Sequence, residues 1–161
     1  QGAQIIGVDL VEQAIHEFFQ EKNEHVECGT VHGIPHFQGD NITLLHANIF
    51  DVNANVIGHV DAIFDRAALV ALPLDRRQEY AEHCLSLLKP SGTILLITYD
   101  SPVADTQGPP FPVRKGTVES LYASASKCEL LTEVTMTPEH DERLAKRGLD
   151  WSRSDIWKIT K

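Results

Sequence analysis

The stretch AQIIGVDLVEQAIHEFF, residues 3–19, joins a strand pattern directly to a helix pattern. Residues 3–10 form a short apolar run that ends in Asp9, as expected of a parallel strand that is covered on both faces. From Val11 onward, apolar residues recur at spacings of three and four, with Glu, Gln and His residues between them, which predicts an amphipathic helix. The stretch therefore predicts a strand, a turn and a helix, a combination typical of α/β proteins.

The same alternation of strands and helices continues along the chain. Apolar runs predict further strands at residues 42–47, 60–65, 93–99, 129–136 and 155–160. Helical patterns lie at residues 75–88 and 117–124, and loops are predicted at 22–41, 105–113 and 138–148. We therefore expect an α/β fold with a mostly parallel sheet and right-handed crossovers.

Composition narrows the class of protein. The 161 residues, 42% hydrophobic and 23% charged, are typical of one globular domain. A formal net charge of −9 argues against nucleic-acid binding, and the apolar runs are too short to span a bilayer. Three cysteines without a pairing pattern favour a reduced, cytoplasmic setting. Because QGAQIIGVDL has no initial Met and enters a strand pattern at once, we expect residues 1–161 to be a single domain that is incomplete at its N-terminus.

Polar residues gather where the expected parallel strands end. Open α/β sheets bind ligands beyond the carboxyl ends of their strands, at a switch in strand order. Four segments are expected at that end of the sheet: Asp9, residues 48–51, the pair Asp65 and Arg66, and residues 99–111. Topology alone therefore predicts a ligand site formed by these segments.

Asp9 has two interpretations. Its carboxylate is placed to accept two hydrogen bonds from a ribose diol, and each charge-assisted bond contributes about 1.5 to 3 kcal/mol. Alternatively, Asp9 and Glu12 have the spacing of a capping box at the start of the following helix. The residues by themselves do not decide between the two.

Asp65 and Arg66 interrupt the apolar stretch IFDRAALVALP, residues 63–73. Neighbouring side chains on a strand point to opposite faces, so the two charges are not expected to neutralise each other. Each then needs its own partner, and the alternative to a ligand is an ion pair with a distant residue. For Arg143 the corresponding alternative is an ion pair with Glu139 or Glu142 on a solvated face.

Two other motifs carry less weight. The spacing H-x2-C-x3-H-x3-H at residues 25–36 has zinc-ligand character, but the glycines and proline within it favour a loop, so we expect no metal site. No G-x-S-x-G elbow and no cysteine in a catalytic setting are present. The stretch GPPFP, residues 108–112, is either a rigid loop or one wall of a substrate pocket.

Taken together, these stretches resemble the thiopurine S-methyltransferase family of S-adenosyl-L-methionine-dependent enzymes. The similarity spans nearly the whole chain: IIGVDLVEQAIHEFF, ITLLHANIFDV, DAIFDRAALVALPLDRRQEYAEHCLSLL, YDSPVADTQGPPFPV and HDERLAKRGLDW. IFDRAALVALP and GPPFPV are its specific motifs. The resemblance implies a Rossmann-like class I methyltransferase sheet, mostly parallel with an antiparallel C-terminal hairpin. The first strand and helix of that fold, with their Gly-rich loop, have no counterpart in this chain.

The resemblance also implies roles for individual residues. Asp9 takes the position of the ribose-binding acid, and Asn48 and Ile49 flank the adenine of S-adenosyl-L-methionine. Arg66 lies beside both cofactor and substrate, and Arg143 is the second substrate-side arginine. The residues that match the wall of the substrate pocket are Pro109 and Pro110.

The expected reaction is methyl transfer to a thiol, thiopurine or selenium or tellurium nucleophile by in-line displacement, with arginines stabilising the anionic acceptor. The expected partner is thus a small molecule, and the family tendency is monomeric. A second reading is an NAD(P)-dependent oxidoreductase, because Asp9 would serve a nicotinamide cofactor's ribose equally well. A third is an inactive or binding-only fragment that lacks the cofactor loop.

Overall fold

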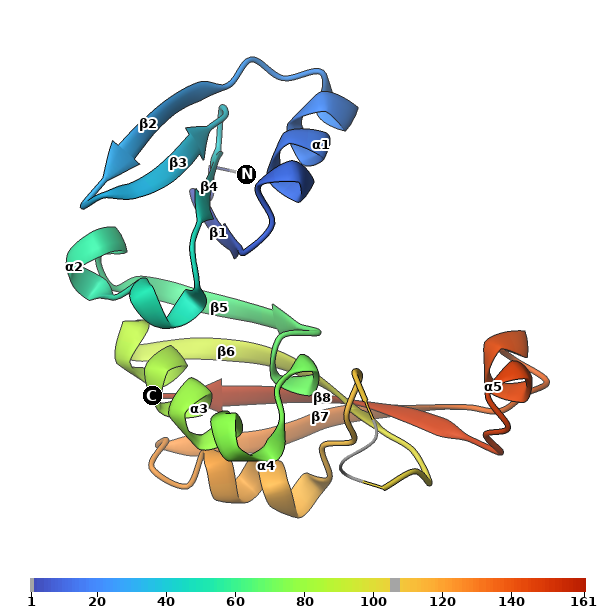
Figure 1. Cartoon of the computed structure of the whole chain (residues 1–161). Helices are drawn as coiled ribbons and strands as arrows, with labels where there is room; N and C mark the ends of the chain where they lie inside the picture. The colour runs from blue at the N-terminus through green and yellow to red at the C-terminus, as the bar shows by residue number, and fades with distance from the viewer. Residues whose placement is uncertain (1, 105–107) are drawn as a thin grey trace. The chain divides into compact units, whose positions relative to one another are not determined.

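The structure, a computed structural model, describes residues 2–104 and 108–161. It divides into two compact units, one ending at Gly58 and the other running from His59 to Lys161, and each unit contains a four-stranded sheet (Figure 1). Both sheets carry helices, so the α/β class predicted from the sequence is confirmed. The described sheets are mixed rather than mostly parallel as predicted, because each has one parallel and two antiparallel strand pairs. None of the described helices is long and apolar enough to cross a membrane.

The first unit has the strand order β1-β4-β3-β2. Strands β1 (Ile5–Asp9) and β4 (Ile42–His46) are parallel, and helix α1 (Glu12–Lys22) follows β1, as the sequence predicts. The turn η1 (Ile49–Asp51) and the short helix α2 (Ala54–Ile57) come after β4.

The predicted loop at residues 22–41 is wrong over most of its length. Strands β2 (Glu27–Val31) and β3 (Ile34–Gln38) form an antiparallel hairpin there, and β3 also pairs with β4. His32 and Gly33 connect the two strands with φ angles of 50° and 82°, and two positive values are typical of the tightest hairpin turns. Gly, His and Pro residues hid the hairpin because they weaken the alternating pattern of a strand.

The second unit has the strand order β5-β6-β8-β7. Strand β5 (Val60–Arg66) is parallel to β6 (Leu88–Asp100), and β8 (Ser152–Thr160) is antiparallel to both β6 and β7 (Lys127–Met136). The antiparallel C-terminal hairpin expected from the family resemblance is therefore present.

Helices and turns connect the strands of the second unit. Helix α3 (Arg77–Leu87) lies between β5 and β6 and is preceded by the turns η2 (Leu69–Ala71) and η3 (Leu74–Arg76). Helix α4 (Lys115–Leu121) lies between β6 and β7. Helix α5 (Glu142–Lys146) corrects the predicted loop at residues 138–148, and the carboxylate of Asp141 caps it by accepting the backbone N–H of Arg143.

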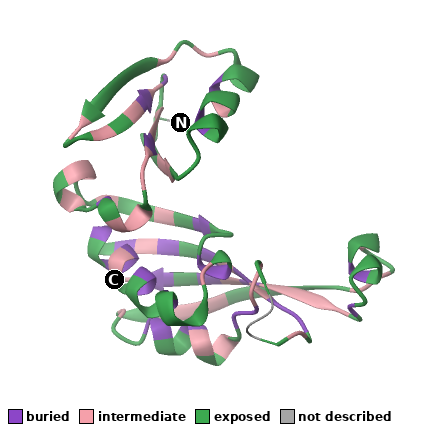
Figure 2. Cartoon of the chain, in the orientation of Figure 1, coloured by how far each residue is buried: buried purple, intermediate pink, exposed green. Residues whose placement is uncertain are grey.

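Each unit has its own buried side chains (Figure 2). In the first unit Ile15 and Phe19 of α1 pack with Phe37 of β3. In the second unit burial alternates along β6, where Ile94 and Leu96 are fully buried and Leu95 is 40% exposed. One face of this strand thus contacts the core.

The outer strands β1 and β5 each pair on one side within the described residues. Both expose large apolar side chains: Ile5 is 53% exposed and Phe64 is 63% exposed. Such edges can accept a further strand.

The alternation along β6 can be tested with two neighbouring leucines. We expect Leu96→Ala to lower the free energy of unfolding by about 2 to 5 kcal/mol, because it leaves a cavity in a filled core. Leu95→Ala should cost about 1 kcal/mol or less, because that side chain is partly in solvent. Urea unfolding of both variants measures the difference, and equal costs would contradict the one-sided burial of β6.

Candidate functional site

Asp9, Asn48 and Ile49 are brought together in the first unit. Because β1 and β4 are parallel, their carboxyl ends lie side by side, with Asp9 in register with His46. The backbone N–H of Ala47 donates to the carbonyl of Asp9 at 3.0 Å, which holds the start of the turn after β4 against the end of β1. Asn48 follows immediately. The predicted ribose and adenine residues thus occupy one end of this sheet.

The carboxylate of Asp9 has one protein donor among the described residues. Its Oδ1 accepts the backbone N–H of Val11 at 2.8 Å in the turn before α1. The N-cap of α1 is Val11 and has no side-chain cap, so the predicted capping box of Asp9 and Glu12 is not formed. The side chain of Glu12 lies near His16 instead, with Oε1 3.9 Å from Nε2. Asp9 is exposed, and its other oxygen can accept hydrogen bonds from a bound diol.

The neighbouring residues fit a nucleoside. The side chain of Asn48 accepts the backbone N–H of Phe50 at 3.1 Å and so fixes the turn η1. Ile49, the first residue of this turn, is half-buried and presents apolar surface beside the exposed polar Asn48. A cavity of about 220 Å³ also reaches Asp9 and is bordered by Phe18. A carboxylate next to apolar surface suits the ribose and adenine of S-adenosyl-L-methionine.

Asp65 and Arg66 lie on opposite faces of β5, as the sequence predicts. Asp65 is 2% exposed, and its Oδ1 accepts the backbone N–H groups of Ala68 and Leu69 at 3.1 and 3.3 Å. Arg66 is exposed. Among the described residues, neither Asp65 nor Arg66 forms an ion pair, so the predicted alternative of a distant ion pair is not seen. The partners of Asp65 are mainly backbone groups.

The surroundings of Asp65 are buried and contain other weak acids. Burial raises the pKa of Asp65, and hydrogen bonds from the Tyr80 phenol and from the two backbone groups oppose this effect. Tyr80 and Tyr122 are also buried, and burial raises the pKa of both phenols. Burial raises the pKa of the Cys84 thiol to about 12, so it stays protonated and unreactive at neutral pH.

Residues 108–113, here called the proline segment, are fastened to the loop that follows Arg66. The backbone N–H of Phe111 donates to the carbonyl of Val70 at 2.7 Å, and that of Val113 donates to the carbonyl of Tyr99 at 2.7 Å. These bonds place the segment between the turn after β5 and the end of β6. The predicted pocket wall is thus held close to the loop that begins at Arg66.

Pro109 is exposed and Pro110 is half-buried, so both remain available to contact a ligand. The predicted loop at 105–113 includes residues 105–107, which lie outside the described residues. From residue 108 to residue 113 the chain is neither helix nor strand, as predicted.

Arg77 was missed by the sequence analysis. It is 1% exposed at the start of α3, and it donates to the carbonyls of Leu72 and Pro112, both at 3.1 Å. Its guanidinium lies 6.0 Å from the ring centre of Phe111. Burial lowers the pKa of Arg77. One buried arginine thus bonds the loop after Arg66 to the proline segment. The available signal was weak: Arg77 is the second of two adjacent arginines in a region that reads as a polar helix start.

Arg143 lies on α5, beyond the far ends of β7 and β8 and well away from the end of β5 (Figure 1). Its side chain is 85% exposed and makes a two-pronged ion pair with Asp141, with nitrogen–oxygen distances of 2.9 Å. The predicted alternative of a surface ion pair is therefore correct, but the partner is Asp141 rather than Glu139 or Glu142. No bond among the described residues joins Arg143 to Arg66.

The four residues with zinc-like spacing lie along the β2–β3 hairpin and its approach. Among residues 2–104 and 108–161, no three His, Cys, Asp or Glu side chains gather in a way that could hold a metal ion. All three cysteines are free, with Cys28 exposed and Cys84 buried.

Solved structures with the same fold define the class. The chain superposes on the cyclopropane synthase MmaA2 from Mycobacterium tuberculosis with a TM-score of 0.63 at 14% identity, covering 98% of this chain and 70% of that one. The N-methyltransferase NodS from Bradyrhizobium japonicum, solved with S-adenosyl-L-homocysteine, gives a TM-score of 0.62 at 11% identity, covering 98% and 66%. The fold is that of the S-adenosyl-L-methionine-dependent class I methyltransferases.

Sequence comparison identifies the family. The family model of thiopurine S-methyltransferase matches residues 1–161. The thiopurine S-methyltransferase of Legionella pneumophila strain Philadelphia 1 is 38% identical over all of this chain and 73% of its own length. That of Nitrosospira multiformis is 35% identical over 99% of this chain and 72% of its own length. The chain belongs to the thiopurine S-methyltransferase family, and with it the methyltransferase class and the S-adenosyl-L-methionine cofactor expected from the sequence are confirmed.

Asp65 can be tested through the pH dependence of stability. Asp65→Asn keeps an acceptor for the N–H groups of Ala68 and Leu69 but cannot ionise. Because the folded-state pKa of Asp65 is raised, the stability that the carboxyl contributes is present at low pH and is lost as pH rises through that pKa. The free energy of unfolding of Asp65→Asn relative to the wild type should therefore increase from about pH 4, near the ordinary aspartate pKa, upward.

The matched variant is Asp65→Ala, which removes both the charge and the acceptor. It should lose about 1 to 3 kcal/mol relative to Asp65→Asn at every pH, because the buried N–H of Leu69 and the partly buried N–H of Ala68 lose their partner. Urea unfolding at several pH values measures both effects. If the free energy of unfolding of the wild type instead rises relative to that of Asp65→Asn as pH increases, the pKa of Asp65 is not raised.

Proposed function

We propose that this methyltransferase transfers the methyl group of S-adenosyl-L-methionine to the sulfur of a small anionic thiol of the thiopurine kind, or to an equivalent selenium or tellurium anion. Membership of the thiopurine S-methyltransferase family supports this proposal, since the relatives that cover the whole chain carry that name. The oxidoreductase alternative is not favoured, because the family and the fold are both those of methyltransferases.

On the cofactor side, Asp9 would accept hydrogen bonds from the ribose diol, and Asn48 and Ile49 would flank the adenine. The exposed second oxygen of Asp9 and the apolar surface of Ile49 support these roles. When bound, the cofactor supplies a methyl group activated by its sulfonium charge. Arg66 would lie beside both cofactor and acceptor, as the family resemblance implies.

On the acceptor side, one observation carries the proposal. Arg66 is exposed, takes part in none of the ion pairs of the described residues, and begins the loop that Phe111 and Arg77 fasten to the proline segment. An exposed guanidinium at the start of a loop that is bonded to a stiff apolar segment suits a small anion with an aromatic body. Pro109 and Pro110 would form that wall.

The arginines would act by favouring the anionic form of the acceptor. An arginine about 4 Å from a thiolate contributes about 4 kcal/mol at an effective dielectric of about 20, which lowers the pKa of the thiol. Arginine stays protonated in proteins, so this effect needs no general base. The acceptor sulfur then forms a bond to the methyl carbon while the bond from that carbon to the sulfonium sulfur breaks, and alignment of the partners supplies most of the remaining catalysis.

Arg143 would be the second arginine, as the family resemblance implies. Because it lies on α5, well away from the end of β5, α5 would have to approach Arg66, and Arg143 would then exchange Asp141 for the acceptor. Its ion pair with Asp141 is largely in solvent, where such pairs contribute only about 0 to 1 kcal/mol. A bound anion could therefore compete with Asp141 at small cost.

We also propose that the enzyme acts as a monomer in the cytoplasm. The family tendency supports the monomer. The three cysteines form no disulfide, which is compatible with a reducing compartment.

Arginine variants test the proposed mechanism. Arg66→Gln and Arg143→Gln should each lower kcat/KM for 6-mercaptopurine by about tenfold or more, because each removes charge that stabilises the thiolate. For Arg66→Gln the rate should also reach its plateau at a higher pH, since more base is then needed to ionise the thiol. Steady-state kinetics at several pH values measures both effects.

Arg147→Gln is the matched control, because Arg147 is an exposed arginine directly after α5 and has no proposed role. Calorimetry with S-adenosyl-L-homocysteine should show weaker binding to Arg66→Gln and unchanged binding to Arg143→Gln. Unchanged rates in both arginine variants would exclude this mechanism. Cofactor binding without any methyl transfer by the wild type would favour the binding-only reading.

A further inference from the structure

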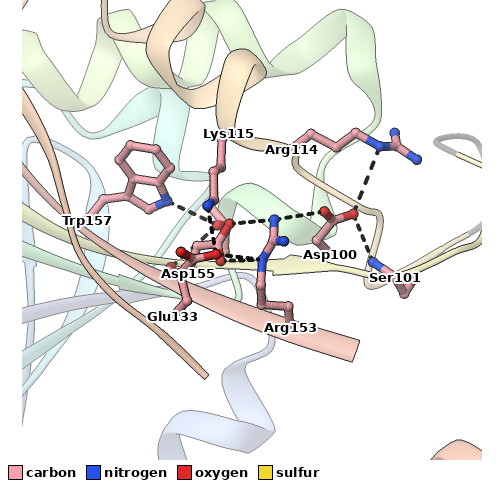
Figure 3. Close-up of polar contacts among 9 residues, drawn as sticks. Asp100, Ser101, Arg114, Lys115, Glu133, Arg153, Asp155 and Trp157 are labelled. Atoms are coloured by element: carbon pink, nitrogen blue, oxygen red, sulfur yellow. Dashed lines mark hydrogen bonds and ion pairs between the residues drawn. The ribbon is translucent and has the colours of Figure 1, made fainter. Parts of the chain in front are cut away.

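A cluster of charged side chains lies where the chain leaves β6 and where it enters α4, on either side of the proline segment (Figure 3). The register of the sheet explains why these side chains meet. Arg153 of β8 lies opposite Asp100, the last residue of β6, and Asp155 lies opposite Glu133 of β7. Residues two apart on a strand share a face, so Arg153 and Asp155 point to the same side of the sheet.

Asp155 fixes the guanidinium of Arg153. The carboxylate of Asp155 is 1% exposed and accepts two hydrogen bonds from Arg153, from Nε at 2.6 Å and from Nη2 at 3.1 Å. Such two-pronged pairing sets both the position and the plane of the guanidinium. These bonds also raise the pKa of Arg153. Arg153 is thus a rigid, permanently charged group in the middle of the cluster.

Arg153 reaches one side of the proline segment through Asp100. Its Nη2 donates to Oδ2 of Asp100 at 3.1 Å, and the other oxygen of Asp100 accepts the backbone N–H of Ser101 at 2.9 Å. The side chain of Arg114, the residue directly after the proline segment, lies 4.0 Å from the same oxygen. Asp100 therefore contacts the chain both before and after the segment.

Arg153 reaches the other side through Glu133. Its Nε lies 3.4 Å from Oε1 of Glu133, and the same oxygen is 2.7 Å from the ammonium of Lys115, the first residue of α4. The hydrogen bond from Lys115 lowers the pKa of Glu133, so this carboxylate is ionised at neutral pH. Cations and carboxylates alternate along the whole path, from Arg114 through Asp100, Arg153 and Glu133 to Lys115.

We propose that Arg153 is a positioning residue for the acceptor. It joins Asp100 and Glu133 into a clamp, here called the Arg153 clamp, that fixes both sides of the proline segment and so sets the distance of Pro109 and Pro110 from the acceptor. The inference rests on the proposed function, since it assumes that the proline segment forms the acceptor wall. The clamp acts through the segment and touches no reacting atom.

Glu133→Gln is the test variant, because it keeps the size of the side chain and removes the charge that holds Lys115 and Arg153. Glu129→Gln is the matched control: Glu129 lies on the same strand, is similarly exposed at 42% against 40%, and has a similar ion pair, to Lys127 at 2.8 Å. Arg153→Lys is a second test variant, since a single ammonium cannot reproduce the planar two-pronged pairing of the guanidinium with Asp155.

The first measurement is amide hydrogen exchange of residues 108–115, followed by mass spectrometry. We expect about fivefold faster exchange in Glu133→Gln and in Arg153→Lys, the size of effect expected when one partly exposed ion pair is lost. Glu129→Gln should exchange at the wild-type rate. The second is kinetics with 6-mercaptopurine. The acceptor KM should rise by about fivefold in both test variants, with kcat, the KM for S-adenosyl-L-methionine and the urea midpoint of Glu133→Gln unchanged.

Two results would overturn the proposal. Exchange at residues 108–115 that is unchanged in Glu133→Gln, or equally faster in Glu129→Gln, would show that the clamp does not hold the segment. Faster exchange with an unchanged acceptor KM would show that the clamp holds the segment but does not position it for the acceptor. Failure of the proposed function is seen separately, as a wild-type protein that does not methylate 6-mercaptopurine, and the exchange experiment still decides whether the clamp holds the segment.

Discussion

The candidate acceptor site depends on the burial of one carboxylate at the end of β5. Asp65 is drawn into the apolar interior because two backbone N–H groups need an acceptor where the strand turns into η2. Since neighbours on a strand face opposite ways, a buried Asp65 obliges Arg66 to point outward. The cost of burying the acid is offset by backbone groups rather than by the adjacent arginine, which leaves the positive charge of Arg66 available to a ligand.

The sequence predicted those parts of the fold in which local pattern and tertiary packing agree. The strand that ends in Asp9, helix α1 and the C-terminal hairpin all show strong periodicity or long apolar runs, and all are present. The β2–β3 hairpin was missed because it is held by pairing to β4, a partner that no local pattern reveals. Helix α5 was missed because five residues give too short a pattern, and a single cap at Asp141 starts it.

For the site, the sequence indicated which residues lie at strand ends but not how they are held. Asp9 and Asn48 could be paired in advance because parallel strands end side by side. The bonds of Arg77 to Pro112 and of Arg153 to Asp100 could not, because only the loop path and the sheet register bring these residues together. The Asp141 partner of Arg143 also depends on local geometry, since Glu142 is adjacent and Glu139 four residues away, yet neither makes such a pair with it in the described residues.

The protonation of the cysteines has a chemical consequence for an enzyme proposed to act on thiols. An acceptor thiol can exchange with a protein disulfide or join an accessible protein thiol under oxidation, and only thiolates take part in such exchange. Burial keeps Cys84 in the protonated form, and burial also raises the pKa of Cys128. Cys84 and Cys128 therefore react slowly with thiol substrates. Cys28 is exposed on the edge strand β2, and mixed disulfides with thiol substrates would form there first.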